Sequence, residues 1–196
     1  MRTALIGLDY IIDIMHPEGK IAASAAQASA RHVIVHANQA LQLAQQRGWL
    51  RILVKVGFAQ GYVDHPAQTA MFRRARELGA LEAGSRGMDF HPDLRAELGE
   101  QVIIKPRISG FYGTNLDATL RARRIERVVI AGVSTCWAVE STVREAHDRD
   151  YEVLILEPAC AAATAEEHEQ AISRLSRIAR VVSLEQLAQV AANASL

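Results

Sequence analysis

The chain has few cysteines, few aromatic residues and no excess of charge of either sign. Its 196 residues include only two cysteines, Cys136 and Cys160, too few for a disulfide framework or a cysteine-based metal site. We therefore expect a protein of the reducing cytoplasm. Basic and acidic residues number 22 each, without a long run of either sign, so nucleic acid is not an expected partner.

Long apolar runs are also missing. No stretch approaches the roughly 18 apolar residues that a membrane span requires. The first residues, MRTALIGLDY, turn polar too early for a signal peptide. With 49% hydrophobic and 22% charged residues, the composition is that of a globular protein with a proper core. We expect a single domain over residues 1–196 and no membrane partner.

Short apolar runs recur along the chain and alternate with segments of helical spacing. The runs predict six strands, at residues 3–9, 51–57, 101–106, 127–133, 151–157 and 180–184. Predicted helices include residues 115–125 and 164–175, the latter with Thr164 and Glu167 in capping-box register. Such alternation is typical of an α/β protein. We therefore predict a three-layer α/β/α Rossmann-like fold with a six-stranded, mainly parallel sheet.

Residues 58–100 break this alternation. The segment contains several glycines, two prolines and one plausible short helix, around residues 68–79. So long an insertion in a compact domain is usually a lid, a binding loop or an oligomer contact. We expect it to be a variable lid.

Three predicted strands end in residues with chemical potential. Ligands of open α/β sheets bind beyond the carboxyl ends of the strands, which directs attention to Asp9, Lys105 and the turn at 132–138. Asp9 either caps a nearby backbone segment or acts as a general acid or base. Lys105 either lies in solvent or holds a carboxylate ionised and stabilises developing negative charge.

The turn itself reads GVSTCWAVEST and begins at Gly132. Ser134 or Thr135 can cap the helix that follows, and its first free N–H groups, around residues 136–138, would face the cleft as an anion or oxyanion site. Cys136 at this terminus is either an activated thiol nucleophile or a small buried apolar residue.

Three segments carry a family pattern in order, and they read ALIGLDYIIDI, IIKPRISGFYGTNLDATLRARRIERVVIAGVST and AVESTVREAHDRDYEVLILEPACAA. With this order and spacing, the chain resembles the isochorismatase-like hydrolases, also called the cysteine hydrolase superfamily. The resemblance implies a Rossmann-like sheet and an Asp–Lys–Cys triad, with a cis peptide ahead of the nucleophile turn. By position, Asp9 and Lys105 match two triad members, and Val133–Ser134 matches the cis peptide.

The third triad member is missing. The family pattern, G-V-[AS]-T-x-x-C-V-E, places the nucleophile at Ala138, whereas Cys136 stands two residues earlier. On a helix, two residues correspond to a rotation of about 200° and a rise of roughly 3 Å. We therefore expect the Cys136 thiol to point away from the triad. The resemblance makes Ser134, Thr135 and Trp137 candidates for substrate or oxyanion binding.

The resemblance also bears on cofactors and partners. Zinc-containing family members use an Asp-x-His pair and a further His in the region that corresponds to residues 50–70. Here Asp64 and His65 are adjacent, so we expect no metal and no other cofactor. A small-molecule substrate is implied. Family members commonly form homodimers or homotetramers, and the apolar stretch 133–146 could contribute to such an interface.

Three functions remain open at this point. In the first, Asp9 protonates a vinyl ether as in isochorismatases that lack the cysteine, Lys105 supports it, and Arg107 pairs with a substrate carboxylate. In the second, the chain is an amidase scaffold without its nucleophile, whether natural or engineered. In the third, the pocket binds a small molecule without turnover. The expected substrate is a small metabolite that is anionic or bears an amide.

Overall fold

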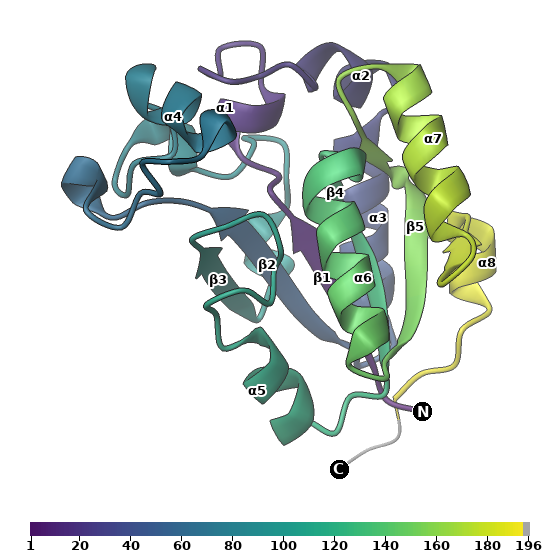
Figure 1. Cartoon of the computed structure of the whole chain (residues 1–196). Coiled ribbons are helices and arrows are strands. Elements are labelled where there is room, and N and C mark those ends of the chain that lie inside the picture. The colour runs from purple at the N-terminus through teal and green to yellow at the C-terminus, as the bar shows by residue number, and fades with distance from the viewer. Residues whose placement is uncertain (194–196) are drawn as a thin grey trace.

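A single six-stranded sheet forms the centre of the computed structural model, which describes residues 1–193 (Figure 1). The expected domain extends to residue 196, and its last three residues lie outside this range. The strands are β1 (Thr3–Leu8), β2 (Leu50–Val56), β3 (Gln101–Lys105), β4 (Arg127–Val133), β5 (Glu152–Ala161) and β6 (Arg180–Val182). They run in the order β3-β2-β1-β4-β5-β6, and every neighbouring pair is parallel. The predicted α/β class and six-stranded parallel sheet are confirmed.

Helices cover both faces of this sheet. The helices of the described chain are α1 (Ile12–Met15), α2 (Ala25–Ala30), α3 (Val33–Gln46), α4 (Ala70–Glu77), α5 (Leu116–Ala122), α6 (Glu140–Asp148), α7 (Ala165–Leu175) and α8 (Leu184–Ala188). Helices α3 and α8 lie on one face, and α5, α6 and α7 lie on the other (Figure 1). None of the helices within residues 1–193 has the length and apolar character to cross a membrane.

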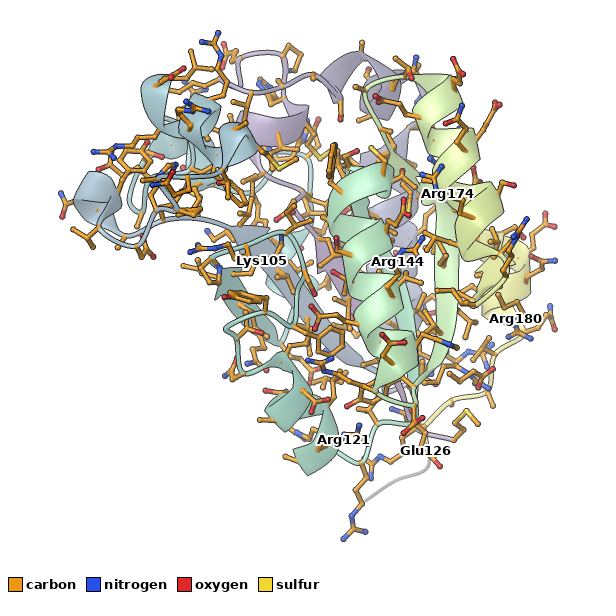
Figure 2. The ribbon with its side chains drawn as sticks, viewed as in Figure 1. Lys105, Arg121, Glu126, Arg144, Arg174 and Arg180 are labelled. Carbon is orange, nitrogen blue, oxygen red and sulfur yellow. The ribbon has the colours of Figure 1, made fainter. Side chains whose placement is uncertain are left out.

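The central strands are buried because each face packs against helices. All six residues of β1 and six of the seven in β4 are buried, which accounts for their nearly continuous apolar sequence. Helices α6 and α7 are joined at the surface by Glu140, whose carboxylate accepts from Arg144 at 2.9 Å and Arg174 at 3.1 Å (Figure 2).

The insertion at 58–100 has a small apolar core of its own. It contains α4 and three 3-10 turns, η1 (Gln60–Tyr62), η2 (Arg86–Met88) and η3 (Ala96–Leu98). Phe58, Phe72 and Leu81 pack in this second cluster. The buried carboxylate of Asp13 ties it to the main body, because its Oδ2 accepts the Leu81 N–H at 2.8 Å. The insertion therefore forms a packed wall beside the carboxyl ends of the strands (Figure 1).

The strand order places a crevice at one point of the sheet. From β1 the chain crosses to β2 and β3 on one side, and later returns to β4 on the other side. A parallel sheet opens a ligand-binding crevice where the direction of winding reverses. The ends of β1 and β4, at residues 8–9 and 133–134, therefore border the expected site.

Candidate active site

Asp9 and Lys105 form a buried ion pair at the carboxyl ends of β1 and β3. Asp9 has a left-handed backbone, with φ of 58°. Its Oδ1 accepts the Val56 N–H at 2.6 Å, and its Oδ2 lies 2.8 Å from Lys105 Nζ. The exposed fractions of the Lys105 and Asp9 side chains are 1% and 3%. Strand β2, which lies between β1 and β3, thus supplies a backbone donor that orients the carboxylate.

The Lys105 ammonium has a partner for each of its three N–H groups. Besides Asp9, it donates to the carbonyl oxygens of Arg107 at 3.3 Å and Ile108 at 2.9 Å. Burial raises the pKa of the Asp9 carboxyl above its ordinary value, and Lys105 and the Val56 N–H offset part of this rise. Asp9 therefore retains a proton more readily than a solvated aspartate does, which suits a general acid or base.

The turn after β4 is wider than the regular helix start that the sequence predicts. The Val133–Ser134 peptide is cis, and residues Thr135–Val139 form a single π-helical turn, η4, before α6 begins. The N–H groups of Trp137 and Val139 both donate to the Ser134 carbonyl at 3.2 Å. The Trp137 N–H is therefore engaged within the turn, contrary to the prediction that the amides of 136–138 are free.

The predicted helix cap is also wrong. Neither Ser134 nor Thr135 caps the turn with its side chain. Instead, Ser134 Oγ lies 3.1 Å from Cys136 Sγ, and Thr135 Oγ1 lies 2.8 Å from Nδ1 of the buried His168. The physical reason is that the Trp137 and Val139 amides of the π-helical turn donate to the Ser134 carbonyl, so the two hydroxyls bond to other partners.

A chain of polar side chains supports the turn from behind. His168 Nε2 lies 2.8 Å from Glu157 Oε1, and Glu157 in turn pairs with Arg31. The hydrogen bond from His168, followed by the charge of Arg31, lowers the pKa of Glu157 to about 2, although burial acts in the opposite direction. Because Thr135 is fully buried against His168, its hydroxyl anchors the turn and is absent from the cavity lining.

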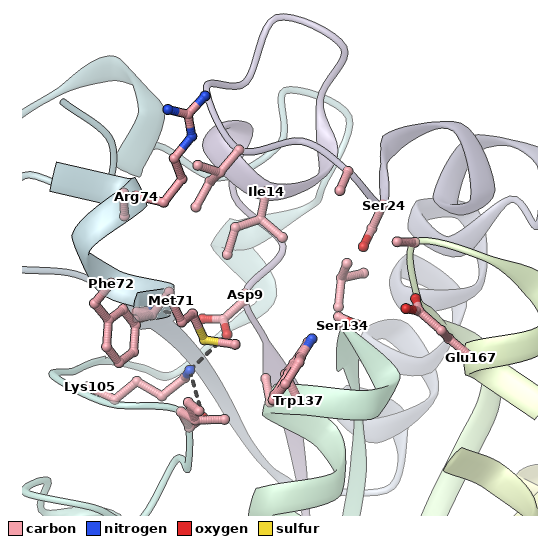
Figure 3. A pocket seen from close by; sticks show the side chains of 18 residues that line it. Asp9, Ile14, Ser24, Met71, Phe72, Arg74, Lys105, Ser134, Trp137 and Glu167 are labelled. Atoms are coloured by element: carbon pink, nitrogen blue, oxygen red, sulfur yellow. Dashed lines mark hydrogen bonds and ion pairs between the residues drawn. The ribbon is translucent and has the colours of Figure 1, made fainter. Parts of the chain in front are cut away.

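A cavity of about 460 Å³ opens in front of the ion pair (Figure 3). Five of the residues singled out from the sequence line it, and they are Asp9, Lys105, Ser134, Trp137 and Ala138. The indole of Trp137 is 52% exposed and stands at the edge of the opening.

Two further candidates lie elsewhere. Cys136 does not line the cavity, in agreement with the expected orientation of its thiol. Arg107 does not line it either, because its Nη1 donates to the Pro106 carbonyl at 2.6 Å and to the Asp64 carbonyl at 3.4 Å. Arg107 is therefore held against its own loop, away from the predicted partnership with a substrate carboxylate.

Sequence reasoning missed the walls of the cavity. They come from the segments before α2, from α4, from the loop after β3 and from α7, and their members include Ile14, Ile21, Ser24, Met71, Phe72, Arg74, Ile108 and Glu167. The sequence does predict a helix within 68–79, but no motif indicates which face of it turns toward Asp9. The only local signal for Glu167 was its capping-box position, which pointed to a structural role.

The residues of the family's zinc region have other partners. Asp64 Oδ1 accepts the Ala59 N–H at 2.8 Å, and His65 Nε2 lies 2.7 Å from the Phe72 carbonyl oxygen. Within residues 1–193, no group of three or more His, Cys, Asp or Glu side chains is placed to hold a metal ion.

Comparison with known proteins assigns the chain to a family. The model of the isochorismatase domain matches residues 3–186. The chain belongs to the isochorismatase family. It is 33% identical over 151 residues to the ureidoacrylate amidohydrolase RutB of Stutzerimonas stutzeri, covering 71% of this chain and 61% of that protein. It is 45% identical over 71 residues to the uncharacterized isochorismatase family protein YecD of Escherichia coli O157:H7, covering 36% of this chain and 38% of that protein.

Solved structures show the same fold. The pyrazinamidase/nicotinamidase of Streptococcus mutans superposes with a TM-score of 0.79 at 28% identity, covering 92% of this chain and 99% of that one. The N-carbamoylsarcosine amidase of Thermoplasma acidophilum gives a TM-score of 0.76 at 26% identity, covering 94% and 98%. The chain spans 61% of the length of this RutB protein and 38% of that of YecD, so the comparisons establish the family and the fold and leave the activity and the substrate open.

Proposed function

We propose that this chain hydrolyses a small substrate at an amide or ureido C–N bond, with Asp9 as general acid and base and Lys105 in support. One observation carries the proposal. The Asp9–Lys105 ion pair lies in the wall of an apolar cavity that Ala138 and Ser134 also line. The amidohydrolase and amidase relatives support a C–N bond as the target.

Because alanine has no nucleophilic atom, the attacking group in this mechanism is water. The Asp9 carboxylate takes a proton from the water as its oxygen bonds to the carbonyl carbon of the substrate. The nitrogen leaving group then receives that proton as the C–N bond breaks, and Asp9 returns to its ionised form. Lys105 remains an ammonium throughout and holds the carboxylate in place through its 2.8 Å contact.

A second candidate is a cysteine-dependent amidase scaffold that lacks its nucleophile. The placement of Ala138 favours it, since this residue lines the same cavity as an intact Asp9–Lys105 pair. A thiol added at position 138 would stand at the start of a helix in the cavity that Asp9 also lines, a setting that activates cysteine. In this case the present chain binds its ligand without turning it over.

One set of assays separates the two candidates. The purified protein and its Asp9→Asn and Ala138→Cys variants are offered primary amides, ureido compounds and isochorismate. Amide or ureido hydrolysis by the unchanged chain, lost in Asp9→Asn, supports the water mechanism. Activity that arises only in Ala138→Cys supports the scaffold.

Two other outcomes contradict the proposal. Hydrolysis of isochorismate alone, abolished by Asp9→Asn, would replace it with acid-catalysed cleavage of a vinyl ether. Amide hydrolysis that is lost in Cys136→Ser would show that the thiol two residues earlier is the nucleophile.

A further inference from the structure

The charged side chains around the cavity differ in whether they have an ion-pair or hydrogen-bond partner. Four ionisable side chains line it, namely Asp9, Lys105, Arg74 and Glu167. Asp9 and Lys105 neutralise each other, and the three N–H groups of Lys105 are occupied by Asp9 and two carbonyl oxygens. Lys105 therefore has no donor left for a negatively charged group of a ligand.

Arg74 does not supply the missing positive charge. Its guanidinium is 68% exposed and lies 3.6 Å from the Glu77 carboxylate on the same helix, α4. Figure 3 shows it pointing away from Asp9, at the outer edge of the cavity. Arg74 thus contributes its aliphatic stem to the wall, while its charged end remains in solvent.

Glu167 and Ser24 both line the side of the cavity away from Lys105 (Figure 3). The Glu167 N–H donates to Thr164 Oγ1 at 3.1 Å, as the capping-box pattern predicts. The reciprocal bond is absent, and the Glu167 carboxylate, on an exposed residue, makes no hydrogen bond or ion pair with any residue of 1–193. Half of the expected capping box is therefore left facing the cavity.

Ser24 is the second polar group without a partner there. The residue is only 5% exposed, and it precedes α2 without capping that helix. Over the described part of the chain, its hydroxyl makes no hydrogen bond. A hydroxyl on a buried residue that lines a cavity and has no protein partner is stabilised when a ligand supplies the partner.

We propose that Ser24 and Glu167 form a subsite for an N–H donor group of the substrate, so that the cavity accepts uncharged or cationic molecules and excludes anions. The inference rests on the proposed function only in taking this cavity as the substrate site. The apolar side chains of Ile14, Ile21 and Phe72 surround the body of the substrate between this subsite and Asp9. Of the two substrate classes expected from the sequence, anionic or amide-bearing, the subsite favours the amide-bearing one.

Binding of three small probes that share one ring tests this charge preference. Benzylamine, benzamide and benzoate present an ammonium, an amide and a carboxylate, and Trp137 at the cavity edge reports their binding by fluorescence. We expect benzylamine and benzamide to bind at least about tenfold more tightly than benzoate, because like charges at close range are strongly disfavoured. Benzoate binding as tightly as the other two overturns the proposal.

Variants of the subsite locate the preference. In Glu167→Gln, the ratio of benzylamine to benzoate affinity falls to about threefold or less, since the charge-assisted bond is lost. Glu166→Gln is the matched control, because Glu166 lies in the same first turn of α7 but bonds to Gln170 and does not line the cavity. Ser24→Ala weakens benzamide about threefold to tenfold, whereas Ser29→Ala, on α2 but outside this cavity, leaves it unchanged.

Equal effects of the Glu166 and Glu167 variants, or none from Ser24→Ala, would contradict the subsite. These measurements require no turnover. If the chain does not hydrolyse amides, the proposed function fails and the charge preference can still be measured. If the charge preference is absent, the subsite fails and the test of hydrolysis is unchanged.

Discussion

The ammonium of Lys105 and the carboxylate of Asp9 are 2.8 Å apart where solvent reaches at most 3% of either side chain. Their attraction offsets a desolvation cost of several kcal/mol for each ion. Three strands contribute to this arrangement, since Asp9 follows β1, Lys105 ends β3, and Val56 of β2 donates its N–H to the carboxylate. The pair is therefore a feature of the sheet itself, and changing either member affects stability as well as chemistry.

Replacing Lys105 with methionine leaves the Asp9 carboxylate buried without its cation. We expect the free energy of unfolding to fall by about 3–5 kcal/mol at neutral pH, which is typical when one partner of a buried pair is removed. Urea unfolding followed by circular dichroism measures this. The double variant Asp9→Asn/Lys105→Met should recover part of the loss. If the double variant is less stable than Lys105→Met, the unpaired Asp9 charge is not the main cause of the lost stability.

The same variant gives a pH dependence of known sign. The folded-state pKa of Asp9 is raised above its ordinary value of 3.8, so the folded chain holds this proton more tightly than the unfolded chain does. Stability from Asp9 is therefore greatest at low pH and is lost as pH rises from the unfolded value through the folded one. Without Lys105 the pKa rises further, so the deficit of Lys105→Met should grow between pH 4 and pH 7. A deficit independent of pH would count against this assignment.

Glu157 behaves in the opposite way. Its folded-state pKa of about 2 lies below its ordinary value of 4.5, so its contribution is present above pH 4.5 and is lost as pH falls toward 2. The side chain is 34% exposed, so solvent screening limits the contribution to about 1 kcal/mol. We expect the stability difference between the unchanged chain and Glu157→Gln to shrink over this range in urea titrations. A difference that is as large at pH 2.5 as at pH 7 would show that the carboxylate charge is not its source.

Much of the fold could be predicted because parallel strands buried on both faces leave a clear record in the sequence. The predicted range 127–133 coincides with β4, and the predicted helix 164–175 begins one residue before α7. Asp9 and Lys105 were identifiable for the same reason, since a charged residue directly after a buried strand must find a partner. Strand β5 runs four residues beyond the predicted end at residue 157, because Pro158 interrupts the apolar pattern without ending the extended backbone.

The walls of the cavity could not be predicted, because they depend on how separate segments pack. Phe72 and Ile14 meet there only after the insertion folds against the segment that follows β1. Glu167 shows the limit most clearly. Its spacing from Thr164 predicts a capping box, yet only the bond from the Glu167 N–H to the Thr164 hydroxyl forms. The carboxylate instead lines a cavity that it shares with Ser24, a residue far away in the sequence.

Gly132 is required by the close approach of β4 to β1. It has φ of 153°, and a Cβ at this position would collide with the Leu8 carbonyl oxygen and lie 2.6 Å from the Leu8 Cβ. Both obstacles are rigid, so we expect Gly132→Ala to lower the free energy of unfolding by more than about 2 kcal/mol. Gly48→Ala is the control, because Gly48 also has positive φ, at 64°, but its Cβ would meet nothing within 4 Å. Its cost should stay near the 1–2 kcal/mol of a left-handed alanine. Equal losses in the two variants would rule out the steric explanation.

The two cysteines should differ in reactivity. Cys160 is fully buried, and burial raises the pKa of its thiol to about 12, so almost none of it is thiolate at neutral pH. Cys136 is partly exposed, with its Sγ 3.1 Å from Ser134 Oγ. We expect a thiol-reactive chromogenic disulfide to titrate one group in the native chain and two in urea, with the native reaction abolished by Cys136→Ser. Because Cys136 lies outside the cavity, that variant should also keep the ligand affinity of the unchanged chain. Native reactivity that survives in Cys136→Ser would mean that Cys160 becomes accessible through local opening, and a loss of ligand binding would place the Cys136 thiol in the site.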